Sequence, residues 1–252
     1  MIRYGLKLWS RNRNLFDEAV ERFSNKEFDF IELGHYPPEP LNFEALAKLK
    51  EIPVTVHQPN DAAFHELIAT DELLSIWRDT LALADFFKSP TIIIHTGKKH
   101  TAESFFENLK KIDDPMIIVE NSPGRDLFNY PMFGQHLEDL KRISEKKPIC
   151  LDLQKAVSAA FHQKLDYKTY IEEVLKTIKP VYFHISGCKR EGPEDPIFLH
   201  GDLWDDDTDW TWIKKQLNAY AAEVRAPLVF ETPKEKNTLA NDIKNIEFFR
   251  SL

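Results

Sequence analysis

The 252-residue sequence is poor in the features that define several protein classes. It has two cysteines, Cys150 and Cys188, which lie far apart and outside any Cys-x-x-Cys pattern. They can build neither a disulfide framework nor a thiolate zinc site, so a reducing cytosol is the expected setting. No apolar run approaches the ~20 residues that cross a bilayer, and a strand is expected from Tyr4 onward. We therefore expect neither a membrane span nor a signal peptide.

Positive charge is also scarce. The chain has 33 lysines and arginines against 41 aspartates and glutamates, which gives a formal net charge of −8. This balance argues against a protein that holds nucleic acid by bulk positive charge, although a local basic groove is compatible with it.

The chain instead alternates short apolar runs with longer segments of helical periodicity, and no linker divides it. The runs read as strands buried on both faces. They are Tyr4–Leu8, Phe28–Leu33, Pro53–His57, Thr91–His95, Met116–Glu120, Ile149–Asp152, Val181–His184 and Leu228–Glu231.

Between these runs, the segments 16–23, 43–49 and 64–87 place apolar residues on one helical face, and Thr101 and Asp209 are expected to cap two later helices. Eight strands alternating with about eight helices predict an α/β protein with a single-domain (βα)8 TIM barrel spanning residues 1–252. A doubly wound open sheet is the alternative, but no Gly-x-Gly-x-x-Gly follows the first run, as a dinucleotide-binding sheet would require.

Ionisable residues stand where the apolar runs end. They are Glu32, one residue before the end of its run, His57, His95, Glu120, Asp152, His184 and Glu231. In a barrel these ends lie on one face, so seven such groups would converge on one mouth. Carboxylates and imidazoles crowded together need a positive charge among them, and a divalent metal ion supplies it.

A single acid or histidine at a strand end is most often a loop-facing group bonded to backbone. Seven in register predict a shared site instead. The remaining histidines fall in expected loops or helices and are interpreted as ordinary surface residues: His35, His65, His100, His136 and His162.

The motifs at these strand ends carry a resemblance that covers essentially the whole chain. They are His57-Gln-Pro59, His95-Thr-Gly97, Glu120-Asn121-Ser-Pro-Gly124, Asp152 with Ala159-Ala160 beyond it, His184 with Lys189, and Glu231-Thr232-Pro233. In order and spacing they resemble the strand-end motifs of the endonuclease IV and xylose isomerase-like TIM-barrel superfamily. That superfamily contains sugar isomerases and epimerases and an endonuclease that cuts DNA at abasic sites.

The resemblance implies a metal quartet of Glu120, Asp152, His184 and Glu231, suited to Zn²⁺, Mn²⁺, Fe²⁺, Co²⁺ or Mg²⁺. On the endonuclease pattern, His57 and His95 would hold a second ion, with Glu120 bridging the two. On the isomerase pattern, His57 would handle substrate instead. One or two divalent ions are therefore expected.

The chain departs from the endonuclease pattern at its third zinc. Lys155 stands where a ligating His follows the strand-six Asp, and of an Asp-x-His pair only His200 is kept. A protonated lysine cannot ligate a metal, but it can supply positive charge; an exposed loop lysine is the alternative interpretation. The acidic run of residues 205–207 would repel a phosphate backbone, and Arg190 resembles an Arg that contacts substrate in the epimerases.

These residues and the resemblance lead to three hypotheses for the function. The first is a metal-dependent isomerase or epimerase of a small carbohydrate-like substrate, in which Glu120 and Glu231 transfer protons and Lys155 and Arg190 bind negative charge; a hydride shift is equally compatible. The second is a metal-dependent phosphodiesterase acting on abasic DNA. The third is a non-catalytic metal- or ligand-binding barrel. The oligomeric state is not predicted.

Overall fold

Eight parallel strands close into a barrel in which each strand pairs with its neighbour in sequence and the last pairs with the first. This computed structural model describes residues 2–37, 39–59, 71–97, 101–125, 131–190, 198–224 and 227–252. The predicted (βα)8 barrel is confirmed. The barrel strands are β1 (Arg3–Trp9), β2 (Phe30–Gly34), β3 (Val54–His57), β4 (Ile92–His95), β5 (Ile117–Glu120), β6 (Ile149–Asp152), β7 (Tyr182–Ile185) and β10 (Pro227–Phe230).

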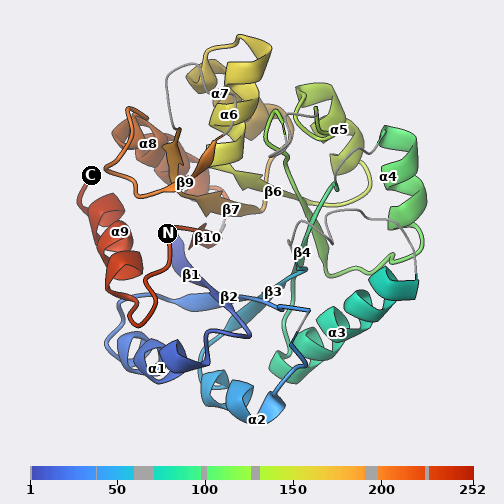
Figure 1. The fold of residues 1–252 in the computed structure, drawn as a ribbon. Coiled ribbons are helices and arrows are strands. Elements are labelled where there is room, and N and C mark those ends of the chain that lie inside the picture. The colour runs from blue at the N-terminus through green and yellow to red at the C-terminus, as the bar shows by residue number, and fades with distance from the viewer. Residues whose placement is uncertain are drawn as a thin grey trace.

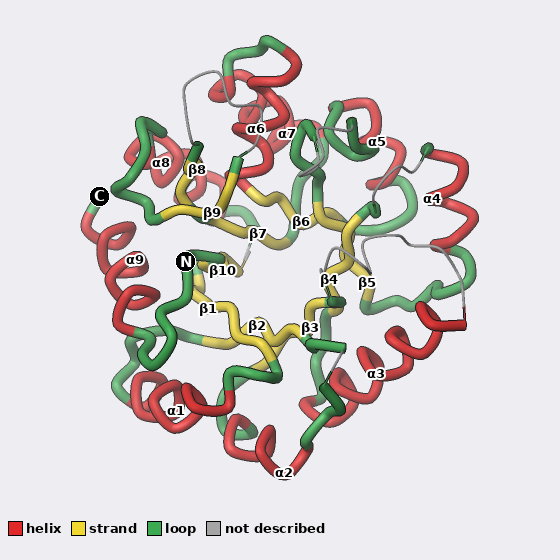
Figure 2. The backbone as a smooth tube through the Cα atoms, in the orientation of Figure 1, coloured by secondary structure: helices red, strands yellow, loops and turns green. Residues whose placement is uncertain are grey.

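Helices form a ring outside these strands (Figures 1 and 2). They are α1 (Phe16–Ser24), α2 (Phe43–Leu46), α3 (Asp71–Phe87), α4 (Ala102–Leu109), α5 (Leu137–Ser144), α6 (Leu153–Gln163), α7 (Tyr167–Thr177), α8 (Trp210–Ala221) and α9 (Ala240–Ser251), with 3₁₀ turns at Arg13–Leu15 and Ala47–Leu49. Within the described ranges, no helix has both the length and the apolar character needed to cross a membrane.

The sequence located most elements within a few residues. Thr101 and Asp209 cap α4 and α8 as predicted, because their side chains accept hydrogen bonds from the backbone N–H groups of Ser104 and Trp212. The helix expected over 64–87 is described from Asp71, and its first residues lie outside the described part of the chain. A short antiparallel hairpin of β8 (Gly187–Lys189) and β9 (Leu199–Gly201), between β7 and α8, was not predicted.

The core has two parts. The larger one lies between the strands and the helices and contains most of the buried aliphatic and aromatic side chains. The smaller one fills the barrel interior below the carboxyl ends of the strands, which we call the upper end, and consists of Phe30, Ile93, Ile118, Cys150, Tyr182 and Val229. We call these six residues the apolar plug. Alternate residues of a strand point to the same side, so the residues two positions further along also face the barrel interior.

Candidate functional site

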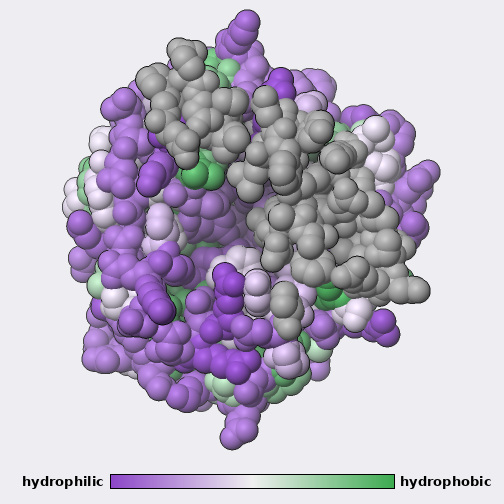
Figure 3. All heavy atoms as spheres, viewed as in Figure 1, coloured by the Kyte–Doolittle hydropathy of each residue, from purple (hydrophilic) through white to green (hydrophobic). Residues whose placement is uncertain are grey.

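The ionisable strand ends form a layer directly above the apolar plug. Each plug residue is followed two positions later by a charged or imidazole side chain, namely Glu32, His95, Glu120, Asp152, His184 and Glu231. The strand register places His95 beside Glu120 and Asp152 beside His184. The structure therefore brings the predicted quartet and histidine pair together at one end of the barrel. Hydrophilic residues border a hollow near the middle of the face turned to the viewer (Figure 3).

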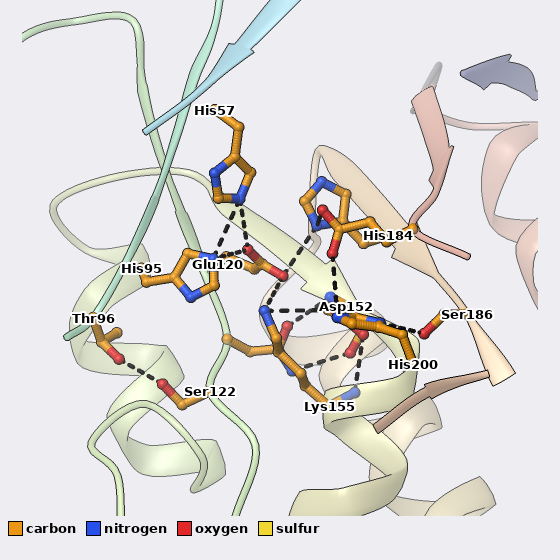
Figure 4. A network of polar contacts seen from close by, with 12 residues as sticks. His57, His95, Thr96, Glu120, Ser122, Asp152, Lys155, His184, Ser186 and His200 are labelled. Atoms are coloured by element: carbon orange, nitrogen blue, oxygen red, sulfur yellow. Dashed lines mark hydrogen bonds and ion pairs between the residues drawn. The ribbon is translucent and has the colours of Figure 1, made fainter. Parts of the chain in front are cut away.

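Glu120 lies at the centre of this layer, and side chains from several strands converge on it (Figure 4). Its Oε1 accepts hydrogen bonds from Lys155 Nζ at 2.5 Å and His184 Nδ1 at 3.0 Å. Its Oε2 lies 2.8 Å from His95 Nε2 and 3.2 Å from His57 Nε2. Burial alone would raise the pKa of Glu120, but the charge of Lys155, together with the charge and hydrogen bond of His184, outweighs it and holds the pKa well below its usual range. Glu120 is therefore an anion with both oxygens engaged.

His57, His95 and Glu120 form a triangle whose geometry fits a metal ion. The two histidine Nε2 atoms are 3.3 Å apart, close to the two distances from Glu120 Oε2. A tetrahedral ion about 2.0–2.1 Å from its ligands separates them by about 3.3 Å. His57 donates from Nδ1 to the Gln58 carbonyl oxygen at 2.6 Å, so Nε2 is the nitrogen left to face an ion. Burial and Lys155 lower the pKa of His95 to about 3, so this ring is neutral.

The quartet of Glu120, Asp152, His184 and Glu231 also fits an ion, since one donor atom from each lies within 4.8 Å of the others. Asp152 caps α6 through Oδ1, which accepts from the Lys155 backbone N–H at 2.9 Å. Its Oδ2 is buried and has no hydrogen-bond partner. The ammonium of Lys155, at 3.6 Å, is close enough for an ion pair but not for a hydrogen bond, so this buried oxygen can still accept a closer cation or donor. The donor chemistry of both sets therefore matches a divalent ion.

Lys155 is buried, with a side-chain exposure of only 7%, so the exposed-loop interpretation is wrong. It lies in the first turn of α6, because Asp152 ends β6 and caps the helix that follows at once. Its ammonium is 2.5 Å from Glu120 Oε1 and 3.6 Å from Asp152 Oδ2. Burial alone would lower the pKa of Lys155, but Glu120 and Asp152 raise it above its ordinary value. A permanent positive charge thus lies inside the candidate site.

Lys7 was not predicted as a site residue, and Glu32 was predicted only as one of the seven strand-end groups. Lys7 Nζ donates to Glu32 Oε1 at 2.6 Å and to Glu231 Oε1 at 2.7 Å. Burial alone would lower the pKa of Lys7, but these two carboxylates raise it. The signal was present, because a lysine between Leu6 and Leu8 in a buried strand requires a charged partner.

His184 connects Glu32 to the quartet. Its Nε2 donates to Glu32 Oε2 at 2.8 Å, while its Nδ1 faces Glu120 and lies 3.6 Å from Glu231 Oε1. Burial alone would lower the pKa of His184, but the surrounding carboxylates raise it well above its usual value. Without an ion, this imidazole is therefore a cation between acids.

His200 lies at the edge of the site, whereas Arg190 belongs to a cavity whose lining includes neither the quartet nor the histidine pair. The guanidinium of Arg190 lies 5.0 Å from the ring centres of both Phe161 and Phe198 and lines a cavity of about 600 Å³ beside α6. His200 contacts Ser186 Oγ through Nδ1 at 2.7 Å, and its Nε2 lies 3.8 Å from Glu231 Oε2. His200 is thus close enough to Glu231 to influence its charge.

One of the other histidines contradicts its sequence interpretation. His35 is buried, at 1% exposure, because it follows β2 directly and its Nδ1 lies 3.2 Å from Ser10 Oγ of the neighbouring strand end. His136 is exposed, as expected, and His162 is partly buried. His65 and His100 lie outside the described residues.

No protein-family model matches the sequence, and a search of curated proteins found no match. Solved structures do match over the whole barrel. Endonuclease IV from Thermus thermophilus matches with a TM-score of 0.73 at 18% identity, covering 99% of this chain and 98% of that one. A D-tagatose 3-epimerase-like protein matches with a TM-score of 0.65 at 15% identity, covering 99% and 96%.

A third match is a xylose isomerase-like TIM-barrel protein from Mycobacterium smegmatis in complex with magnesium, with a TM-score of 0.62 at 11% identity, covering 95% of this chain and 88% of that one. The predicted resemblance to endonuclease IV and the xylose isomerase-like barrels is thus confirmed for the fold. At these identities, an epimerase and an abasic-site endonuclease are not distinguished.

Proposed function

We propose that this barrel is a divalent-metal-dependent isomerase or epimerase of a small sugar, sugar phosphate or related hydroxy-carbonyl compound. The observation that carries the proposal is the buried Lys155. Its ammonium is 2.5 Å from Glu120, on the residue that replaces a third-ion ligand of the endonuclease pattern. A fixed ammonium at this position leaves room for fewer metal ions. It can also stabilise the oxyanion of an enediolate or bind a substrate phosphate.

An ion held by Glu120, Asp152, His184 and Glu231 would polarise adjacent carbonyl and hydroxyl oxygens and acidify the C–H between them. Three carboxylates and one imidazole suit Mn²⁺, Mg²⁺, Fe²⁺, Co²⁺ or Zn²⁺. His57 and His95, with Glu120, would hold a second ion, or His57 would orient the substrate.

Glu231 is the better base of the two proposed proton carriers. Its side chain is 11% exposed, whereas that of Glu120 is fully buried. Lys7 binds Oε1 of Glu231 and leaves Oε2, which lies near His200, to take the substrate proton. Both oxygens of Glu120 are engaged and its carboxylate is ionised, so Glu120 would first have to take up a proton from solvent, once Lys155 shifts to the substrate oxyanion, before it could return one from the opposite face. Arg190 would bind the far end of the substrate.

The test is incubation of the Mn²⁺-loaded protein in D₂O with a panel of ketopentoses, ketohexoses and their phosphates. We expect one of them to isomerise with deuterium entering at the carbon next to the carbonyl. Glu231→Gln should lower the rate about 10²–10⁴-fold, which is the range for loss of a general base. Conversion without deuterium would indicate a hydride shift, and an ion-loaded protein that converts none of the panel would contradict the proposal.

The second candidate, a phosphodiesterase for abasic DNA, is favoured by one observation. The His57, His95 and Glu120 triangle beside the quartet gives two overlapping donor sets, as a two-ion hydrolase needs. An abasic-site duplex with Zn²⁺ or Mn²⁺ tests it. Incision that Glu231→Gln abolishes would replace the isomerase proposal, whereas tight ion binding with neither reaction would leave a non-catalytic binding barrel.

A further inference from the structure

Lys7 and Glu32 form an ion pair at the edge of the candidate site, outside the quartet and the histidine pair. They are direct partners in the parallel register of β1 and β2, and both side chains are buried. Lys7 Nζ bridges Glu32 Oε1 and Glu231 Oε1 at 2.6 and 2.7 Å. One ammonium on β1 thus fixes carboxylates from β2 and β10.

The second oxygen of Glu32 reaches His184. Glu32 Oε2 accepts a hydrogen bond from His184 Nε2 at 2.8 Å. A ring flip that turned Nε2 towards the quartet would break this hydrogen bond. The other nitrogen, Nδ1, lies 3.0 Å from Glu120 Oε1 and 3.6 Å from Glu231 Oε1. The ring therefore presents Nδ1 to the quartet.

We propose that Glu32, held by Lys7, is a positioning residue that selects Nδ1 of His184 as the metal-binding nitrogen. The inference rests on the metal site proposed above. A ligating histidine usually donates its other N–H to a carboxylate, which fixes the tautomer and the ring orientation, and loss of that partner costs about 10–100-fold in metal affinity. Lys7 fixes Glu231 at the same time, so the pair aligns two of the four ligands.

The competing explanation is that Glu32 only balances the charge of Lys7. Two variants distinguish the effect of the length of the Glu32 side chain from the effect of its charge. Glu32→Asp keeps the charge but is one methylene shorter, so its carboxylate no longer reaches His184 Nε2. Glu32→Gln keeps the length and removes the charge. Positioning predicts that both variants lose Zn²⁺ affinity about 10–100-fold, whereas charge balance predicts a loss only in Glu32→Gln.

The measurements are competition with a chromophoric chelator for Zn²⁺, the visible absorption spectrum of the Co²⁺-loaded protein, and ¹⁵N NMR of the histidine rings in the Zn²⁺-loaded protein. We expect weaker binding and an altered Co²⁺ spectrum in both variants. Glu138→Gln is the matched control, because Glu138 pairs with Lys141 on the exposed surface of α5; its affinity should not change.

The NMR measurement needs no substitution at Glu32, so it holds even if a variant fails to fold. In the unmodified protein, His184 should carry its proton on Nε2 and the metal on Nδ1. Metal on Nε2, or a Glu32→Asp variant with unchanged affinity and Co²⁺ spectrum, would overturn the inference alone. An unmodified protein that binds no divalent ion would overturn the proposed function together with it.

Discussion

The two layers inside the barrel come from the same strands but differ in how they are stabilised. The apolar plug holds Ile118 and the layer above holds Glu120, two residues further along β5 and pointing the same way. The lower layer is stabilised by buried apolar area. The upper layer loses hydration on folding and depends on pairing, since Glu120 contacts Lys155 and three histidines. The lower layer supports the barrel, and the upper layer contains the ionisable groups of the candidate site.

The largest effect should come from Glu120→Gln. The amide keeps the volume but removes the anion to which Lys155 and His184 donate, so buried positive charges lose their partner. We expect the free energy of unfolding of the metal-free protein to fall by about 3–5 kcal/mol, measured by urea denaturation, and metal binding to be lost. A variant that keeps wild-type Zn²⁺ affinity would contradict the central role of Glu120.

Acid should destabilise the upper layer selectively. Burial alone would raise the pKa of Glu32, but His184 and Lys7 outweigh it and lower the pKa from 4.5 to about 2. A depressed carboxyl pKa stabilises the fold above the unfolded value, and that stability is lost as pH falls from about 4.5 to about 2. The loss is on the order of 3 kcal/mol for this group. Urea melts between pH 5 and 2 should show a shallower decline for Glu32→Gln than for the unmodified protein; equal slopes would refute it.

Ile118→Ala tests the lower layer at the position directly below Glu120. The lost methyl groups should cost about 2–3 kcal/mol, at the low end for such a truncation, because Ile118 already borders a cavity at the other end of the barrel. Zn²⁺ affinity per folded molecule should stay unchanged, as chelator competition would show. A large loss of affinity would mean that the two layers are not separable.

Lys155→Met should give the smallest loss of stability, and that loss should differ most between the metal-free and the Zn²⁺-saturated protein. The metal-free protein should lose about 1.5–3 kcal/mol, the range for a hydrogen bond to a charged group. Saturating Zn²⁺ should restore most of it, because the ion neutralises the same carboxylates. Turnover should still fall about 10–100-fold, since Lys155 is proposed to act on the substrate oxyanion. Unchanged turnover would remove Lys155 from the site, and Lys48→Met, at an exposed pair with Asp17, is the control.

The sequence predicted the barrel because its apolar runs and helical segments alternate without interruption. It also predicted that the ionisable strand ends would gather in one layer, since the carboxyl ends of the parallel strands of a barrel lie at the same mouth; their role as metal ligands stays a prediction. It could not predict which ammonium binds which carboxylate. The pairing of Lys7 with Glu32 depends on the register of β1 and β2, and the burial of Lys155 depends on α6 starting directly after Asp152. The prediction for His35 was wrong because a loop position in the sequence does not show that the side chain turns inward and contacts Ser10.

The most direct test of the account is anomalous diffraction from crystals soaked in Mn²⁺ or Zn²⁺. We expect a peak within about 2.0–2.6 Å of donor atoms from Glu120, Asp152, His184 and Glu231, with His184 contributing Nδ1. A second peak between His57, His95 and Glu120 would show that the site holds two ions. No peak at the quartet in crystals soaked to saturation would contradict the central claim that the upper layer of this barrel is a metal centre.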